Sequence, residues 1–95
     1  LYHTGSASYI YNATGTLFTL ADTFEVKGSN GNETHLKTVD NGAVELYHNN
    51  SKKIETTSGG VEVTGSVTAT SFSGSGANLT GLPAGFSELD AALFN

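Results

Sequence analysis

Apolar and polar residues alternate along much of this chain, most regularly in its second half. Apolar or small residues occupy every second position of one stretch, namely Val61, Val63, Gly65, Val67 and Ala69. An earlier stretch, VELY over residues 44–47, alternates in the same way. A period of two predicts β-strands that have one buried face and one solvent-exposed face.

Clusters of Gly, Asn, Asp and Ser interrupt the chain about every ten to thirteen residues, which is typical of turns between short strands. The runs between these clusters are rich in β-branched and aromatic residues. They predict strands over residues 8–11, 16–20, 23–27, 34–39, 43–48, 53–57 and 61–71. We therefore expect an all-β fold built of short strands.

The pattern changes after Phe72 and divides the chain into three regions. Residues 1–72 form the β segment, and residues 73–86 form a connector rich in Gly and Ser. Residues 87–95 predict a short helical tail, because Ser87 is a suitable N-cap and acidic residues follow it in the first turn.

The predicted strands carry few apolar residues, which limits the core that one chain can form. Only 37% of the residues are hydrophobic, and Gly, Ser, Thr and Asn together make up nearly half of the chain. There is no Cys, so neither a disulfide nor a thiolate–metal site can compensate. Association with other chains is the remaining way to bury enough apolar surface.

The charge of the chain excludes some classes of partner. The net charge is −5, with four Lys and no Arg, which argues against nucleic-acid binding. No apolar run approaches the roughly 18 residues that a membrane-spanning helix needs, so we expect no membrane insertion.

Two adjoining segments carry a resemblance to a known class of protein. They are NGAVELYHNNSKKIETTSGGVEVTG over residues 41–65 and ATSFSGSGANLTG over residues 69–81. These segments resemble the repetitive fibre region of tailed-bacteriophage tail fibres and related virion appendages. The resemblance covers residues 41–85, and residues 3–26 are similar more loosely. His48 and Asn49 depart from it, because the family often has Tyr-Asp there.

The resemblance implies an elongated, intertwined homotrimeric fibre, similar to a β-helix or β-prism, whose strands pair between chains. It implies a location in the virion and a structural role as a rigid shaft that supports host attachment. The partners would be two identical copies and other fibre or tail proteins. Two alternatives stay open: a module that binds host surface glycans, and the stalk of a bacterial trimeric adhesin.

Apolar residues on the predicted buried faces are the candidates for the core of such a trimer. We expect the following residues to face the common axis: Val44, Leu46, Ile54, Val61, Val63, Val67, Ala69, Ile10, Leu20, Phe24, Val26 and Leu36.

Side chains able to carry catalysis or bind a cofactor form no recognisable motif. The three His residues include no His-x-His pair, although three copies of one His could meet at a trimer axis and bind a metal ion. No nucleophile elbow occurs, and Glu55 and Glu62 are expected to be solvated charges. We expect no enzyme activity and no cofactor. Four Tyr residues could stack on sugars or simply pack against neighbours: Tyr2, Tyr9, Tyr11 and Tyr47.

Overall fold

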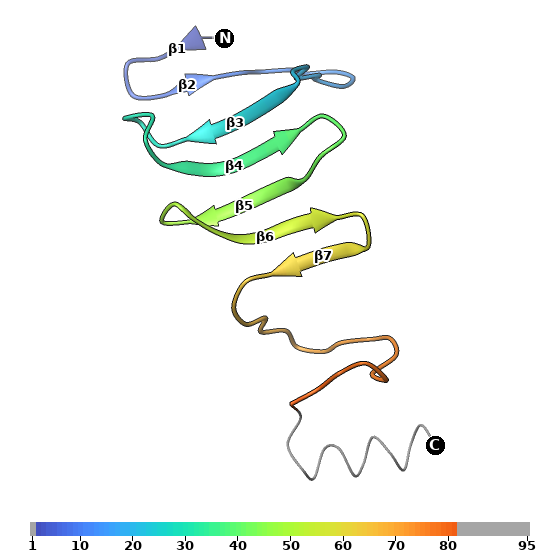
Figure 1. The fold of residues 1–95 in the computed structure, drawn as a ribbon. Helices are drawn as coiled ribbons and strands as arrows, with labels where there is room; N and C mark the ends of the chain where they lie inside the picture. The colour runs from blue at the N-terminus through green and yellow to red at the C-terminus, as the bar shows by residue number, and fades with distance from the viewer. Residues whose placement is uncertain (1, 82–95) are drawn as a thin grey trace.

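The computed structural model describes residues 2–81, which form two antiparallel β-sheets and no helix (Figure 1). The first sheet has two strands, β1 (Tyr2–His3) and β2 (Ser8–Tyr9). The second sheet has five strands in chain order, namely β3 (Thr23–Lys27), β4 (Thr34–Val39), β5 (Val44–His48), β6 (Ser51–Thr57) and β7 (Gly60–Val63). The expected all-β class is confirmed.

The five-stranded sheet contains the predicted strands that match best. The bounds of β3 and β4 are those predicted, and β5 and β6 begin within two residues of the predicted positions. Two predictions were wrong. Residues 16–20 form no strand, and the strand predicted over 61–71 stops at Val63 because the chain turns away at Gly65, whose φ is 115°.

Every strand pair between β3 and β7 lies within the single chain. Each strand pairs with the next one along the sequence, so the sheet is a simple meander. The resemblance implied strands paired between chains. In the five-stranded sheet, β4, β5 and β6 each pair with two neighbouring strands of the same chain, so they cannot pair with another chain. Only the outer edges of β3 and β7 lack a neighbour in the described chain.

Asparagine residues form the tight turns that fold the chain into hairpins. Asn49 and Asn50 have φ of 50° and 65°, and they form the two-residue loop between the paired residues His48 and Ser51. Positive φ at both positions is typical of a type I′ turn, whose twist matches that of the strands, and Asn tolerates this conformation. The Asn50 Oδ1 atom also accepts a hydrogen bond of 3.0 Å from the backbone N–H of Thr34, which ties the turn to β4.

The register of the meander separates its side chains into two chemically distinct faces, since directly opposed residues share a face and successive residues alternate. One face carries a central row that crosses all five strands, formed by Val26, Leu36, Leu46, Ile54 and Val63. The other face carries a charged row, formed by Glu25, Lys37, Glu45, Glu55 and Glu62. One sheet therefore has an apolar side and a charged side.

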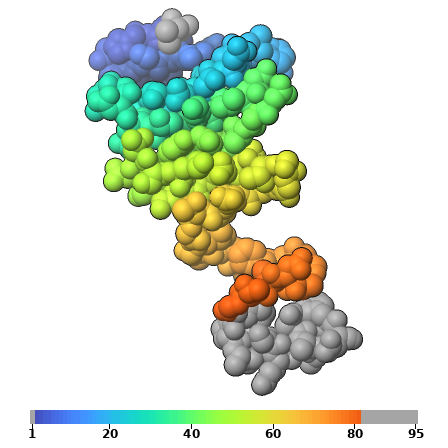
Figure 2. Space-filling view, viewed as in Figure 1, coloured from blue at the N-terminus to red at the C-terminus, as the bar shows by residue number. Residues whose placement is uncertain are grey.

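No residue among the described ones is buried, so this part of the chain has no core of its own. The radius of gyration is 20.0 Å and the principal extents are 60 × 31 × 28 Å. A compact domain of this length has a radius of gyration of roughly 12 Å. The strands lie across the long direction and follow one another along it (Figures 1 and 2).

Residues 64–81 continue beyond the sheet without a strand or a helix. Figure 2 shows the molecule narrowing where this segment leaves β7. The predicted helical tail over 87–95 and the last residues of the connector lie outside the described residues.

Candidate functional site: an uncovered apolar face

The apolar face of the five-stranded sheet is the most extensive feature that one chain leaves incomplete. We use the term apolar face for Phe24, Val26, Leu36, Val44, Leu46, Ile54, Val61 and Val63, which share one side of β3 to β7. None of these side chains is buried, and Leu46 at the centre is 41% exposed. No other described element packs on this side, because the only element contacts are between neighbouring strands of each sheet.

Eight of the twelve residues expected at the trimer axis make up this apolar face, which brings them together on one surface. The other four lie outside the sheet. Ile10 and Leu20 belong to the segment between β2 and β3, where Leu20 is 87% exposed. Val67 and Ala69 follow β7 in the extended segment, and both are exposed.

Two threonines lie on the same side of the sheet as the apolar face, and reasoning from the sequence missed them. Thr38 is opposite Val44, and Thr56 is opposite Val61. The Thr56 Oγ1 atom accepts a hydrogen bond of 3.0 Å from the backbone N–H of Val44, so its polar atom is satisfied within the sheet. The alternation of β4 and β6 places these threonines beside the apolar residues, which is the signal that could have identified them.

The charged row occupies the opposite face, and Lys52 lies against two of its carboxylates. Lys52 Nζ lies 3.0 Å from Glu55 Oε2 and 3.8 Å from Glu45 Oε2. Glu45, Glu55 and Glu62 are direct cross-strand neighbours, and such like-charged pairs destabilise a sheet. Lys52 offsets part of this repulsion. Solvent screens such surface ion pairs strongly, so they contribute little to stability and this face is a solvated one.

Tyr47 also lies on the charged face, where it makes a short hydrogen bond to a carboxylate of the charged row. Its hydroxyl donates to Glu45 Oε1 at 2.6 Å. This hydrogen bond raises the pKa of Tyr47 above 10.0, since the carboxylate stabilises the protonated phenol. The hydrogen bond to Glu55 likewise raises the pKa of Lys52 above 10.5.

Alkaline pH is therefore expected to weaken the sheet through Tyr47 and Lys52. A group whose pKa is raised by folding contributes its full stability below the unfolded pKa, and that stability is lost as pH rises through the folded pKa. We expect unfolding to become easier above about pH 10, and Tyr47→Phe to reduce this alkaline loss. The free energy of unfolding, measured with urea across that pH range for the unsubstituted chain and for Tyr47→Phe, tests this expectation. The same alkaline loss in Tyr47→Phe would contradict the role of Tyr47.

The three histidines are placed on separate elements: His3 in β1, His35 in β4 and His48 at the end of β5. His3 Nδ1 lies 2.6 Å from Ser8 Oγ across the first hairpin. Within residues 2–81 no group of three or more His, Cys, Asp or Glu side chains could hold a metal ion. A site made from three copies of one His stays a prediction about the assembled protein.

The four tyrosines do not form one patch. The Tyr2 and Tyr9 rings stack across the first hairpin with their centroids 5.0 Å apart, and both are about half exposed. Tyr47 lies on the charged face of the other sheet, where Glu45 accepts its hydroxyl hydrogen. Sugar stacking by the Tyr2–Tyr9 pair stays a prediction.

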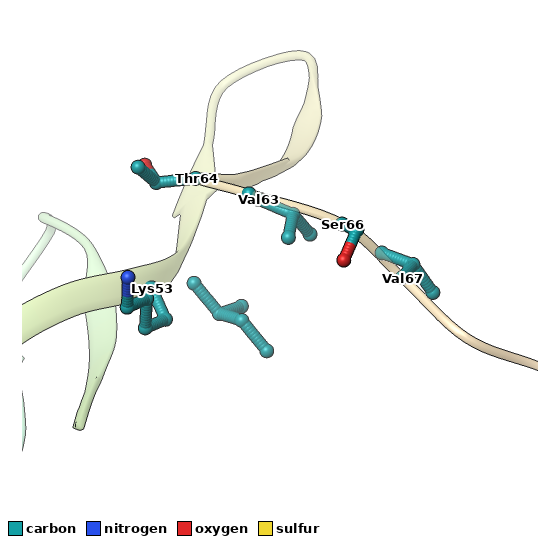
Figure 3. Close-up of a pocket in the computed structure, with 7 residues that line it drawn as sticks. Lys53, Val63, Thr64, Ser66 and Val67 are labelled. Carbon is teal, nitrogen blue, oxygen red and sulfur yellow. The ribbon is translucent and has the colours of Figure 1, made fainter.

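An open hollow lies at the end of the apolar face, where the chain leaves the sheet. It holds about 500 Å³ and is lined by Lys53, Ile54, Val63, Thr64, Gly65, Ser66 and Val67. Figure 3 shows Val63 and Val67 on the same side of the chain, with Thr64 pointing the other way. The hollow has no cluster of polar groups that would orient a small ligand, so its walls are suited to an apolar side chain.

The comparisons with known proteins add no relative. No family model matches the sequence, and no similar curated protein or solved structure is found. Among the described residues, no helix is both long and apolar enough to cross a membrane.

Proposed function

We propose that this chain is a structural segment of a bacteriophage tail fibre or a related virion appendage, in which three copies form a rigid shaft. The observation that carries the proposal is the apolar face, which spans five strands and is uncovered in the described chain. Copies that turn these faces toward a common axis supply one another with a core. The number of copies and the virion location come from the resemblance of residues 41–85.

The exposed surface of the chain supports assembly quantitatively. The chain exposes 8140 Å², whereas a compact monomer of its mass exposes roughly 5,200 Å². The excess is therefore about 3,000 Å² per chain. A subunit of a cyclic trimer has two interfaces and loses roughly 2,000–5,000 Å² when these are of the obligate size. The excess falls within that range.

The arrangement of strands explains how such an assembly would bear load as a shaft. The strands cross the long direction of the chain (Figure 1). Each five-stranded sheet would then form one side of a three-sided prism, with its charged face outward. The apolar faces meet inside, and the charged rows keep the outer walls solvated. A threefold cyclic assembly closes on itself, so it does not grow sideways. The role is mechanical: the shaft holds a host-binding part away from the particle.

The native mass of the 95-residue chain tests this proposal. We expect sedimentation velocity and native mass spectrometry to give three times the chain mass of 9.8 kDa. A species of one chain mass would overturn the proposal. A species of two chain masses would contradict the trimer and favour two sheets packed face to face.

A further inference from the structure

Within residues 2–81 the last strand of the sheet has one edge without a partner strand, and the backbone groups of this edge point outward. β7 pairs with β6 on one side only. The N–H of Thr64 donates to the carbonyl of Lys53 at 2.8 Å, which makes the opposed residues Val63 and Ile54 a non-hydrogen-bonded pair. The backbone N–H and C=O groups of Val63, and by alternation those of Val61, therefore point away from β6. Such an edge is a template for another strand.

The segment that follows β7 has the composition of a strand but no partner in the described chain. Residues 66–72 read SVTATSF, in which three of the seven residues are β-branched. Val67 and Ala69 alternate with Thr68 and Thr70. Its backbone makes no backbone–backbone hydrogen bond within residues 2–81. Unpaired backbone groups are costly once they leave water, so this segment gains by pairing when an assembly encloses it.

In this conformation residues 66–72 cannot pair with the β7 edge of the same chain. Gly65 has φ of 115°, in the region that favours glycine, and it directs residues 66–72 away from β7. The hollow bounded by Ile54, Val63 and Val67 opens at this point (Figure 3). An incoming strand on the β7 edge would place an apolar side chain there.

We propose that residues 66–72 of one copy pair with the free edge of β7 in a neighbouring copy and add a sixth strand to its sheet. This inference rests on the proposed function, in that identical copies assemble. The occupant is a second copy because the described part of each chain offers both the unpaired edge of β7 and, directly after it, an unpaired segment of strand-like composition. Pairing of one with the other between copies is a head-to-tail contact that can close a ring. Val67 and Ala69 would then extend the apolar face of the neighbouring sheet.

A proline scan over Val67, Thr68, Ala69 and Thr70 tests the pairing. Proline is tolerated in an edge strand where its N–H would face solvent, and it breaks the ladder where the N–H is bonded. We expect a period of two: substitutions at alternate positions weaken assembly at least about tenfold in dissociation constant, and those between them have little effect. Thr68→Val, which keeps the N–H and the branched side chain, is the matched control.

Amide hydrogen exchange of the unsubstituted chain gives an independent measurement. We expect protection of alternate amides within residues 66–72 in the assembled protein, because only every second N–H of an added edge strand faces its neighbour. Exchange of this segment at the rate of a free peptide, or equal effects of proline at all four positions, would overturn the inference while the oligomer and the proposed function stood. A chain of monomeric native mass would overturn both.

Discussion

Replacing Leu46 with Asp is expected to abolish assembly. Leu46 lies at the centre of the central row, directly opposite Leu36 on one side and Ile54 on the other. In a trimer with its apolar faces inward, three carboxylates would meet in an apolar environment without a partner. Leaving a buried charge uncompensated costs about 3–5 kcal/mol, and each 1.4 kcal/mol weakens binding tenfold. We expect a dissociation constant at least about a hundredfold higher for Leu46→Asp.

Sedimentation velocity over a concentration series measures this effect. Thr57→Asp is the matched control, because Thr57 is exposed and shares the charged face with Glu55, two residues earlier in β6. Leu46→Met tests the position itself, since this volume-conserving substitution is usually tolerated in a core. We expect both controls to assemble like the unsubstituted chain. Assembly of Leu46→Asp with unchanged affinity would show that the apolar face is not the contact between copies.

Dilution is expected to unfold the protein at the same concentration at which it dissociates. No described residue is buried in the single chain, so in the proposed assembly the hydrophobic stabilisation of the sheet would arise when copies meet. A sheet with one hydrophobic face must bury that face against another element to be stable. Folding and association should therefore be one step, as in obligate oligomers whose monomers have no stable fold.

Thermal unfolding followed by circular dichroism tests this coupling. We expect the midpoint temperature to rise with protein concentration, because mass action favours the assembled state. The β signal and the oligomer mass should fall together on dilution. A folded monomer whose midpoint temperature does not depend on concentration would contradict the coupling, and it would require a core that the described residues do not contain.

Local chemistry made the hairpins of the larger sheet predictable. Turn residues such as Asn49 and Asn50 mark a loop whose φ values most residues avoid, and the alternating runs on either side then define β5 and β6. The apolar face followed from the same alternation. Residues 16–20 misled the prediction because a β-prone run forms a strand only where a second strand pairs with it. That pairing is not encoded in the run itself.

Register was the part that the sequence could not supply. The shift between β5 and β6 leaves Lys53 as an extra residue, so that Tyr47 is opposite Lys52 while Leu46 is still opposite Ile54. This bulge brings Lys52 to the carboxylates of the charged row. Alternation in β6 alone would place Lys53 on the face of Glu55 and Lys52 on the face of Ile54, so it would indicate the wrong lysine as the partner of Glu45.

The meander also determines how a shaft of this kind could change its length. Because the strands lie across the long direction (Figure 1), each added strand would lengthen the stack by about 4.8 Å. A single extra strand would reverse the direction in which the chain leaves the sheet. An extra hairpin would add about 10 Å and restore that direction. Duplication or loss of hairpin-coding segments would thus change the reach of the shaft in discrete steps and leave its cross-section unaltered.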